Sequence, residues 1–155
     1  MPASVDKIII SDTACLIGLT NIGQIDILRK MYGEIIVTRE VAQEYGSPLP
    51  DWIEVREISD VSKTVFSKLL EIGEASAIAL AMQTENAMLI VDDKRARQFA
   101  LGLGIEITGT LGVLIQAYES GVLQGIEAIV AGLRKIGFRL LANTEALIGE
   151  IKKQA

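Results

Sequence analysis

Acidic side chains stand where this chain could do chemistry. Two short apolar runs, "KIIIS" (residues 7–11) and "MLIV" (88–91), lead directly into aspartates, and glutamates lie in two segments with helical spacing. Carboxylate oxygens are the ligands that Mg²⁺ and Mn²⁺ prefer, and such an ion activates water and stabilises the charge on a phosphodiester. The candidate catalytic and metal-ligating residues are Asp12, Glu44, Glu74, Asp92 and Asp93.

The composition leaves few other chemistries. The 155 residues include no histidine, which removes the usual general base, the Ser-His-Asp arrangement and His-ligated zinc. The single cysteine, Cys15, cannot form an internal disulfide, and its apolar neighbours predict a reduced, buried thiol. Catalysis would therefore depend on carboxylates, hydroxyls, lysine or arginine.

Charge and hydropathy restrict the partners. The net charge of −5 argues against broad electrostatic adhesion to nucleic acid, although bound cations would neutralise a local acidic cluster. No apolar run approaches the ~18 to 20 residues of a membrane span, and the first residues do not resemble a signal peptide. We expect a cytoplasmic protein with no membrane partner.

Short apolar strands and helical segments alternate along the chain and would position the acids. Runs rich in β-branched residues predict buried parallel strands, and the alternation predicts a central, mostly parallel sheet with helices on both faces. Because ligands bind beyond the carboxyl ends of such strands, acids that follow two strands should meet at one sheet edge. The expected strands are 7–11, 33–38, 52–58, 88–91 and 105–108, with 52–58 at a sheet edge.

One expected helix bears on the site. Residues 61–73 have helical spacing, with Ser59 or Asp60 as the cap and Gly73 as the stop. Glu74 would then open the next helix, where the helix dipole favours a negative charge.

Each acid also has an ordinary structural explanation. Asp12 and Asp93 can cap the helices that follow them. Glu40 and Glu44 share a helix face, but only Glu40 lies in the first turn, where the dipole explains an acid. Taken together, acids from four segments near one edge favour a site, because neighbouring carboxylates cannot all stay ionised without a cation among them.

Five segments, in this order, resemble a PIN-domain protein, closest to the short prokaryotic PIN proteins related to VapC-type toxins. They are "IIISDTACLIGL", "EIIVTREVAQEYG", "GEASAIALAM", "LIVDDKRARQFALGLG" and "ITGTLGVLIQAYESG". The resemblance covers roughly residues 7–138 and implies one three-layer α/β/α domain over 1–155, with a helical tail at 139–155. It also implies a metal-dependent ribonuclease with an acidic pocket.

The resemblance assigns roles residue by residue. Asp12 matches the first aspartate of the family, after strand one, and Glu44 matches the glutamate after strand two, ahead of Glu40. Glu74 stands where the family usually has an aspartate, so its longer side chain would reach the ion through water. Asp93 matches the aspartate after the next strand, and its neighbour Asp92 is not separated from it by the sequence.

The resemblance also implies supporting residues and partners. Thr13 and Thr110 match hydroxyl positions near the metal, although Thr110 equally suits a plain helix N-cap, which we expect. Lys94, Arg95 and Arg97 would meet the RNA backbone, unless they form an ordinary solvated helix face. The toxin relation adds a small antitoxin protein as a partner.

Two other functions fit parts of the pattern. A catalytically idle PIN fold would serve binding or homodimer formation through apolar helices such as residues 13–28. A receiver-like phospho-accepting domain also gathers acids around Mg²⁺, but its acidic pair follows strand one. Here the pair comes late, and "IEITGTLG" offers no lysine.

Overall fold

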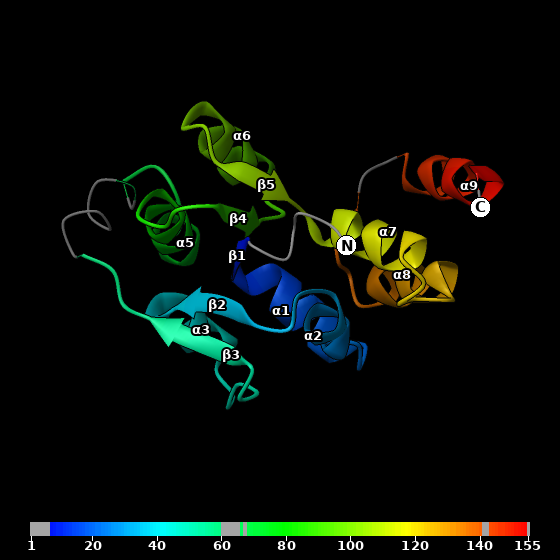
Figure 1. Ribbon diagram of the computed structural model, residues 1–155, viewed down its shortest axis with the longest axis horizontal. Helices are drawn as coiled ribbons and strands as arrows, with labels where there is room; N and C mark the ends of the chain where they lie inside the picture. The colour runs from blue at the N-terminus through cyan, green and yellow to red at the C-terminus, as the bar shows by residue number, and fades with distance from the viewer. Residues whose placement is uncertain (1–6, 60–65, 67, 141–142, 155) are drawn as a thin grey trace.

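A five-stranded sheet in which every neighbouring pair is parallel forms the centre of the molecule (Figure 1). The computed structural model describes residues 7–59, 66, 68–140 and 143–154. The strand order is β3-β2-β1-β4-β5, which differs from the 2-1-3-4-5 order of receiver domains and excludes that fold. The strands are β1 Ile8–Ser11, β2 Ile35–Thr38, β3 Ile53–Arg56, β4 Ala87–Ile90 and β5 Glu106–Thr108.

Helices cover both faces of the sheet, which confirms the predicted three-layer α/β/α architecture (Figure 1). Successive strand residues point to opposite faces, so Ile9 and Ile10 enter different cores. The core containing Ile9 includes residues of α1, α2, α7, α8 and α9, and the core containing Ile10 includes those of α5 and α6. The helices are α1 Thr13–Asn21, α2 Asp26–Tyr32, α3 Arg39–Tyr45, α5 Ile72–Met82, α6 Lys94–Gly102, α7 Thr110–Glu119, α8 Ile126–Lys135 and α9 Thr144–Gln154.

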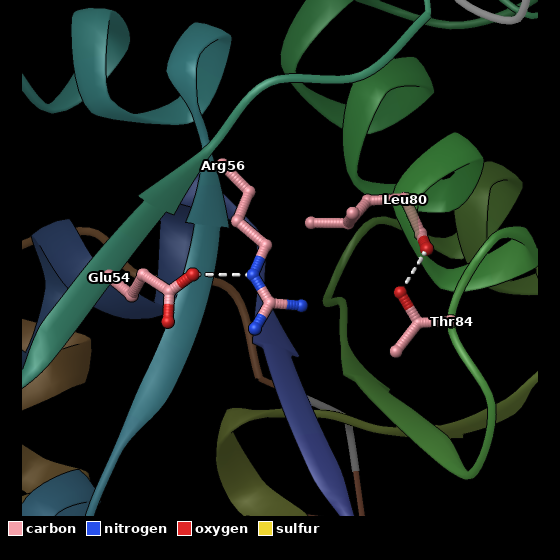
Figure 2. Close-up of polar contacts among 4 residues, drawn as sticks. All are labelled: Glu54, Arg56, Leu80 and Thr84. Atoms are coloured by element: carbon pink, nitrogen blue, oxygen red, sulfur yellow. Dashed lines mark hydrogen bonds and ion pairs between the residues drawn. The ribbon is translucent and has the colours of Figure 1, made fainter.

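The strand β3 is the predicted edge strand, and it carries exposed charged side chains. Glu54 and Arg56, two residues apart, form an ion pair on the side of the sheet that α5 covers (Figure 2). In the same view the hydroxyl of Thr84 donates to the carbonyl of Leu80 at 2.7 Å and satisfies an acceptor at the end of α5. Charges on an edge strand oppose pairing with another chain.

The predicted stop at Gly73 is wrong. Gly73 is the second residue of α5, and residues 68–71 just before this helix are not helical. Residues 61–65 and 67 of the expected helix lie outside the described residues, as does the expected cap Asp60. Glycine occurs inside α5 because another side chain occupies the space of its missing Cβ, as described below.

In the described parts of the chain, no helix is both long enough and apolar enough to cross a membrane. The predicted buried thiol is confirmed, because Cys15 has no exposed surface.

Candidate functional site

Asp12 is buried at the carboxyl end of β1 and joins two strands. Only 3% of it is exposed. Its Oδ1 accepts a hydrogen bond from the amide of Cys15 at 3.0 Å, so Asp12 is the N-cap of α1. Its Oδ2 accepts from the amide of Asp92 at 3.0 Å. The capping explanation is therefore correct for one oxygen, while the other fixes the end of β1 against the residues that follow β4.

Asp92 is held by the first residue of α7. Its carboxylate accepts from the amide of Thr110 at 2.8 Å and from the Thr110 hydroxyl at 2.6 Å. The N-cap of α7 is Gly109, so the expected N-cap role of Thr110 is wrong. The reason is that Asp92, reaching in from the neighbouring strand end, accepts the free amide at this helix terminus in place of a local cap.

Burial and mutual repulsion disfavour charge on this inner pair, Asp12 and Asp92. Burial, then the charge of Asp92, raise the pKa of Asp12 to about 8, against its hydrogen bonds from Cys15 and Asp92. Burial also raises the pKa of Asp92, opposed by the hydrogen bonds from Thr110 and by the charge of Arg97. A cation beside the pair would favour the charged forms of both.

Glu44 reaches the same edge from α3. Its Oε1 accepts from the hydroxyl of Thr13 at 2.5 Å, which links α3 to the start of α1. The Glu44 carboxylate also lies against Gly73, where an added Cβ would stand 2.1 Å from Oε1. A Cβ at residue 73 would therefore displace the end of the Glu44 side chain. Glu40, the less favoured candidate, is buried on α3.

Glu74 and Asp93 form the outer, more exposed part of the cluster. Asp93 is the N-cap of α6 and accepts from the amide of Ala96 at 3.0 Å. Burial, then the charges of Asp93 and Glu71, raise the pKa of Glu74 to about 7, and the charge of Glu44 adds to this. A hydrogen bond from the backbone of Glu71, the N-cap of α5, acts in the opposite direction. We call Glu44, Glu74 and Asp93 the outer group.

Buried hydroxyls fix α3 relative to α5, the two helices that carry the glutamates. Thr38 caps α3 through the amide of Val41, and its hydroxyl is 2.6 Å from that of Ser76. The Ser76 hydroxyl lies 2.8 Å from the carbonyl of Gly73, to which it donates. This chain of hydrogen bonds runs from the end of β2 to the residue that touches Glu44, so it sets the separation of Glu44 from α5.

The three basic residues after β4 lie in different surroundings. Arg97 is half-buried, donates to the carbonyl of Val91 at 2.9 Å and lies beside Asp92. Lys94 and Arg95 are exposed, and Arg95 borders a cavity together with Glu74 and Asp93. The structure thus brings Arg95 to the outer group and uses Arg97 to support the inner pair.

The chemistry of these residues suits a hard divalent cation. In the described ranges, no three acidic or thiol side chains are arranged so that they could together hold a metal ion. Mg²⁺ usually binds through one or two carboxylates, retains several waters and adds substrate phosphates, so a pair of acids suffices. The donors available here are oxygens only. Burial, and then the charge of neighbouring carboxylates, raise the pKa of Asp12 and of Glu74, and a cation would relieve the repulsion.

Two functional contacts were missed by sequence reasoning. In the sequence Gly73 suits a helix stop, since glycine after an apolar run commonly ends a helix. Lys68 borders the cavity beside Glu74, but nothing in the run "SKLLEIG" distinguishes it from a solvated lysine.

A family model described as a PIN domain matches residues 8–154. The match spans all the strands and helices described above. Comparisons with curated proteins and with solved structures give no significant match.

Proposed function

The chain belongs to the PIN-domain family, whose fold is nuclease-like, and on that premise we propose that it is a Mg²⁺- or Mn²⁺-dependent endoribonuclease. One observation carries the proposal. Asp12 and Asp92 meet at the carboxyl ends of β1 and β4, with Glu74 close enough to raise the pKa of Asp12. Ligands of parallel α/β sheets bind at this edge.

The residues take distinct roles in the proposed reaction. Asp12, Glu44, Glu74 and Asp93 would hold the ion directly or through water, with Asp92 as a further ligand. A bound ion would lower the pKa of a water molecule and offset charge on the phosphodiester.

The hydroxyls and the buried arginine position the acids. Thr13 orients Glu44, and Thr110 orients Asp92, so two of the carboxylates enter the reaction with fixed directions. Arg97 lies beside Asp92 and favours its charged form, which is the form that binds a cation.

A cleavage assay on matched variants tests the proposal. We expect the wild type to cleave RNA with Mn²⁺ or Mg²⁺, and Asp12→Asn to lose at least about 100-fold in rate, since even outer-shell partners of a metal site commonly contribute 10- to 100-fold. Glu34→Gln removes one carboxylate at the amino end of β2, away from the carboxyl ends of the strands where the site lies. It should leave the rate unchanged. Equal rates for Asp12→Asn and the wild type would show that the site is wrong.

A second candidate is a PIN fold that binds partners without catalysis. It is favoured by the observation that no three acids among the described residues are arranged to hold one ion. Isothermal titration with Mn²⁺ distinguishes the two. A wild type that neither binds Mn²⁺ nor cleaves RNA would support the binding module, and its association state would then test homodimer formation.

The sequence resemblance to VapC-type toxins would extend the proposal to a protein partner. A small antitoxin would cover the acidic edge, and a basic side chain at Glu74 and Asp93 would offset part of the charge of the outer group. Such a partner would block RNA cleavage when added to the purified chain. Cleavage that is insensitive to a partner bound at this edge would contradict the extension.

A further inference from the structure

A cavity of about 450 Å³ opens beside the outer group. Its volume lies within the range of ligand sites, ~300 to 1,000 Å³. It accommodates a group the size of a nucleotide and is too small for a double helix. The residues around it are Lys68, Leu69, Leu70, Glu71, Glu74, Asp93 and Arg95.

Two cations from separate segments border this cavity. Lys68 precedes α5, and Arg95 lies in the first turn of α6. Both are exposed, and neither forms an ion pair with any residue that the structure describes. Arg56 on β3, by contrast, forms an ion pair with Glu54.

The charge around the cavity changes sign when a divalent ion binds. Two basic side chains face three acidic ones, which leaves an excess of one negative charge. One divalent ion held by Glu74 and Asp93 would turn this into an excess of one positive charge. The cavity would then attract an anion, and Lys68 and Arg95 are the groups that contact it directly.

We infer that Lys68 and Arg95 bind backbone phosphates of single-stranded RNA in this cavity, next to the carboxylates that would hold the ion. The inference rests on the proposed function and adds Lys68 as a substrate-binding residue. Arg97 is unsuited to this role because its guanidinium donates to the Val91 carbonyl. Lys94 does not border the cavity.

Binding of a labelled single-stranded phosphorothioate RNA, whose linkages keep their charge and resist hydrolysis, tests the inference. We expect Lys68→Ala/Arg95→Ala to weaken binding in Mg²⁺ at least about tenfold. The slope of log K against log salt should become shallower by about 1.4, since each single-strand phosphate contact contributes roughly 0.7. Lys68→Arg/Arg95→Lys should keep most of the affinity.

The matched control removes the same charge elsewhere. Arg29→Ala/Lys30→Ala deletes two exposed cations from α2, on the other side of the molecule from α5 and α6 (Figure 1). It should leave affinity within about twofold and the salt slope unchanged. Equal losses in both double variants, no loss in either, equally tight binding of duplex RNA, or no binding by the wild type would overturn the inference.

Cleavage assays on the same variants separate this inference from the proposed function. RNA binding that depends on Lys68 and Arg95 without any cleavage by the wild type would contradict the ribonuclease and leave the inference standing. The wild type could instead cleave RNA while replacement of Lys68 and Arg95 changes neither binding nor cleavage. That result would contradict the inference and leave the ribonuclease standing.

Discussion

The inner pair and the outer group of carboxylates share one sheet edge but differ in what the fold gains from them. Asp12 and Asp92 are largely buried, and each accepts two hydrogen bonds, from backbone amides or from Thr110. The outer group is more exposed, and its members accept from Thr13, from Ala96 or from the start of α5.

This difference separates structural from chemical roles. Removing an inner carboxylate leaves buried donors without acceptors, so stability and any activity would fall together. Within the outer group, Asp93 caps α6 and Glu44 accepts from Thr13, whereas removal of the Glu74 carboxylate mainly relieves repulsion. Variants of Glu74 are therefore the cleaner probes of chemistry.

The largest expected effect on stability is that of Asp12→Ala. It removes the N-cap of α1, typically about 1 kcal/mol, and leaves the Asp92 amide unpaired, a further ~1 to 3 kcal/mol. After relief of the repulsion with Asp92, we expect a net loss of about 1 to 3 kcal/mol in the free energy of unfolding, measured in urea. Glu34→Ala is the control, and a loss below ~0.5 kcal/mol would erase the distinction between the two regions.

Thr110→Val should have the next largest effect. It keeps the shape and the amide of residue 110 but removes the hydroxyl bond to Asp92 at 2.6 Å, and we expect a loss of about 1.5 kcal/mol. Thr110→Ser, which retains the hydroxyl, should lose less than half as much. Equal losses in both variants would show that the methyl group, which serine lacks, contributes as much as the hydroxyl bond to Asp92.

A smaller effect should appear in the pH dependence. Glu74 has a pKa of about 7 in the folded chain against 4.5 for an ordinary glutamate, so the folded state keeps a proton that the unfolded state has released. Its contribution to stability is complete below about pH 4.5 and is lost as pH rises through 7.

Glu74→Gln should therefore flatten the decline of stability between pH 5 and 8 in metal-free buffer. We compare the free energy of unfolding of Glu74→Gln with that of the wild type at each pH. After discounting for solvent screening, this difference should favour the variant by roughly 0.5 to 1 kcal/mol more at pH 8 than at pH 5. Thermal unfolding across this range measures it. A steeper decline in Glu74→Gln would contradict the raised pKa.

Gly73→Ala should change stability least. The atom that a Cβ would meet is the end of the flexible Glu44 side chain, which can move aside, and alanine favours the helix. We expect a change within about 0.5 kcal/mol, together with a fall of roughly tenfold in cleavage, because a ~1 Å misplacement of a reacting group can lower a rate up to 100-fold. Unchanged cleavage would show that Glu44 does not act from this position.

The parallel sheet and the meeting of Asp12 with Asp92 follow from local signals. Short β-branched runs predict strands, and parallel strands end at a common edge, so the acids behind β1 and β4 are predicted to lie at that edge. The direct pairing of β1 with β4, and the choice of Asp92 over Asp93 as the partner of Asp12, come from the structure. The sequence does not predict the contact between Glu44 and Gly73, because this contact depends on how α3 packs against α5. The same holds for Lys68, whose environment arises from the approach of α5 to α6.

The role of Thr110 shows that the sequence does not predict every single hydrogen bond of the site. Its sequence context suits a cap, and the structure gives the cap to Gly109 because Asp92, 18 residues earlier, takes the Thr110 amide and hydroxyl. Sequence patterns report neighbours along a helix, whereas this partner comes from another strand.

The hydrogen bond from the Asp92 amide to Asp12 joins residues 80 positions apart, which has a consequence during synthesis. A ribosome-bound chain that ends before β4 contains Asp12, Glu44 and Glu74 but lacks Asp92, Asp93 and Arg95. Since β4 occupies an inner position of the sheet, β1 cannot be completed on that side until β4 emerges. High contact order of this kind delays assembly. The carboxylates at this end of the sheet therefore come together only after β4 has emerged.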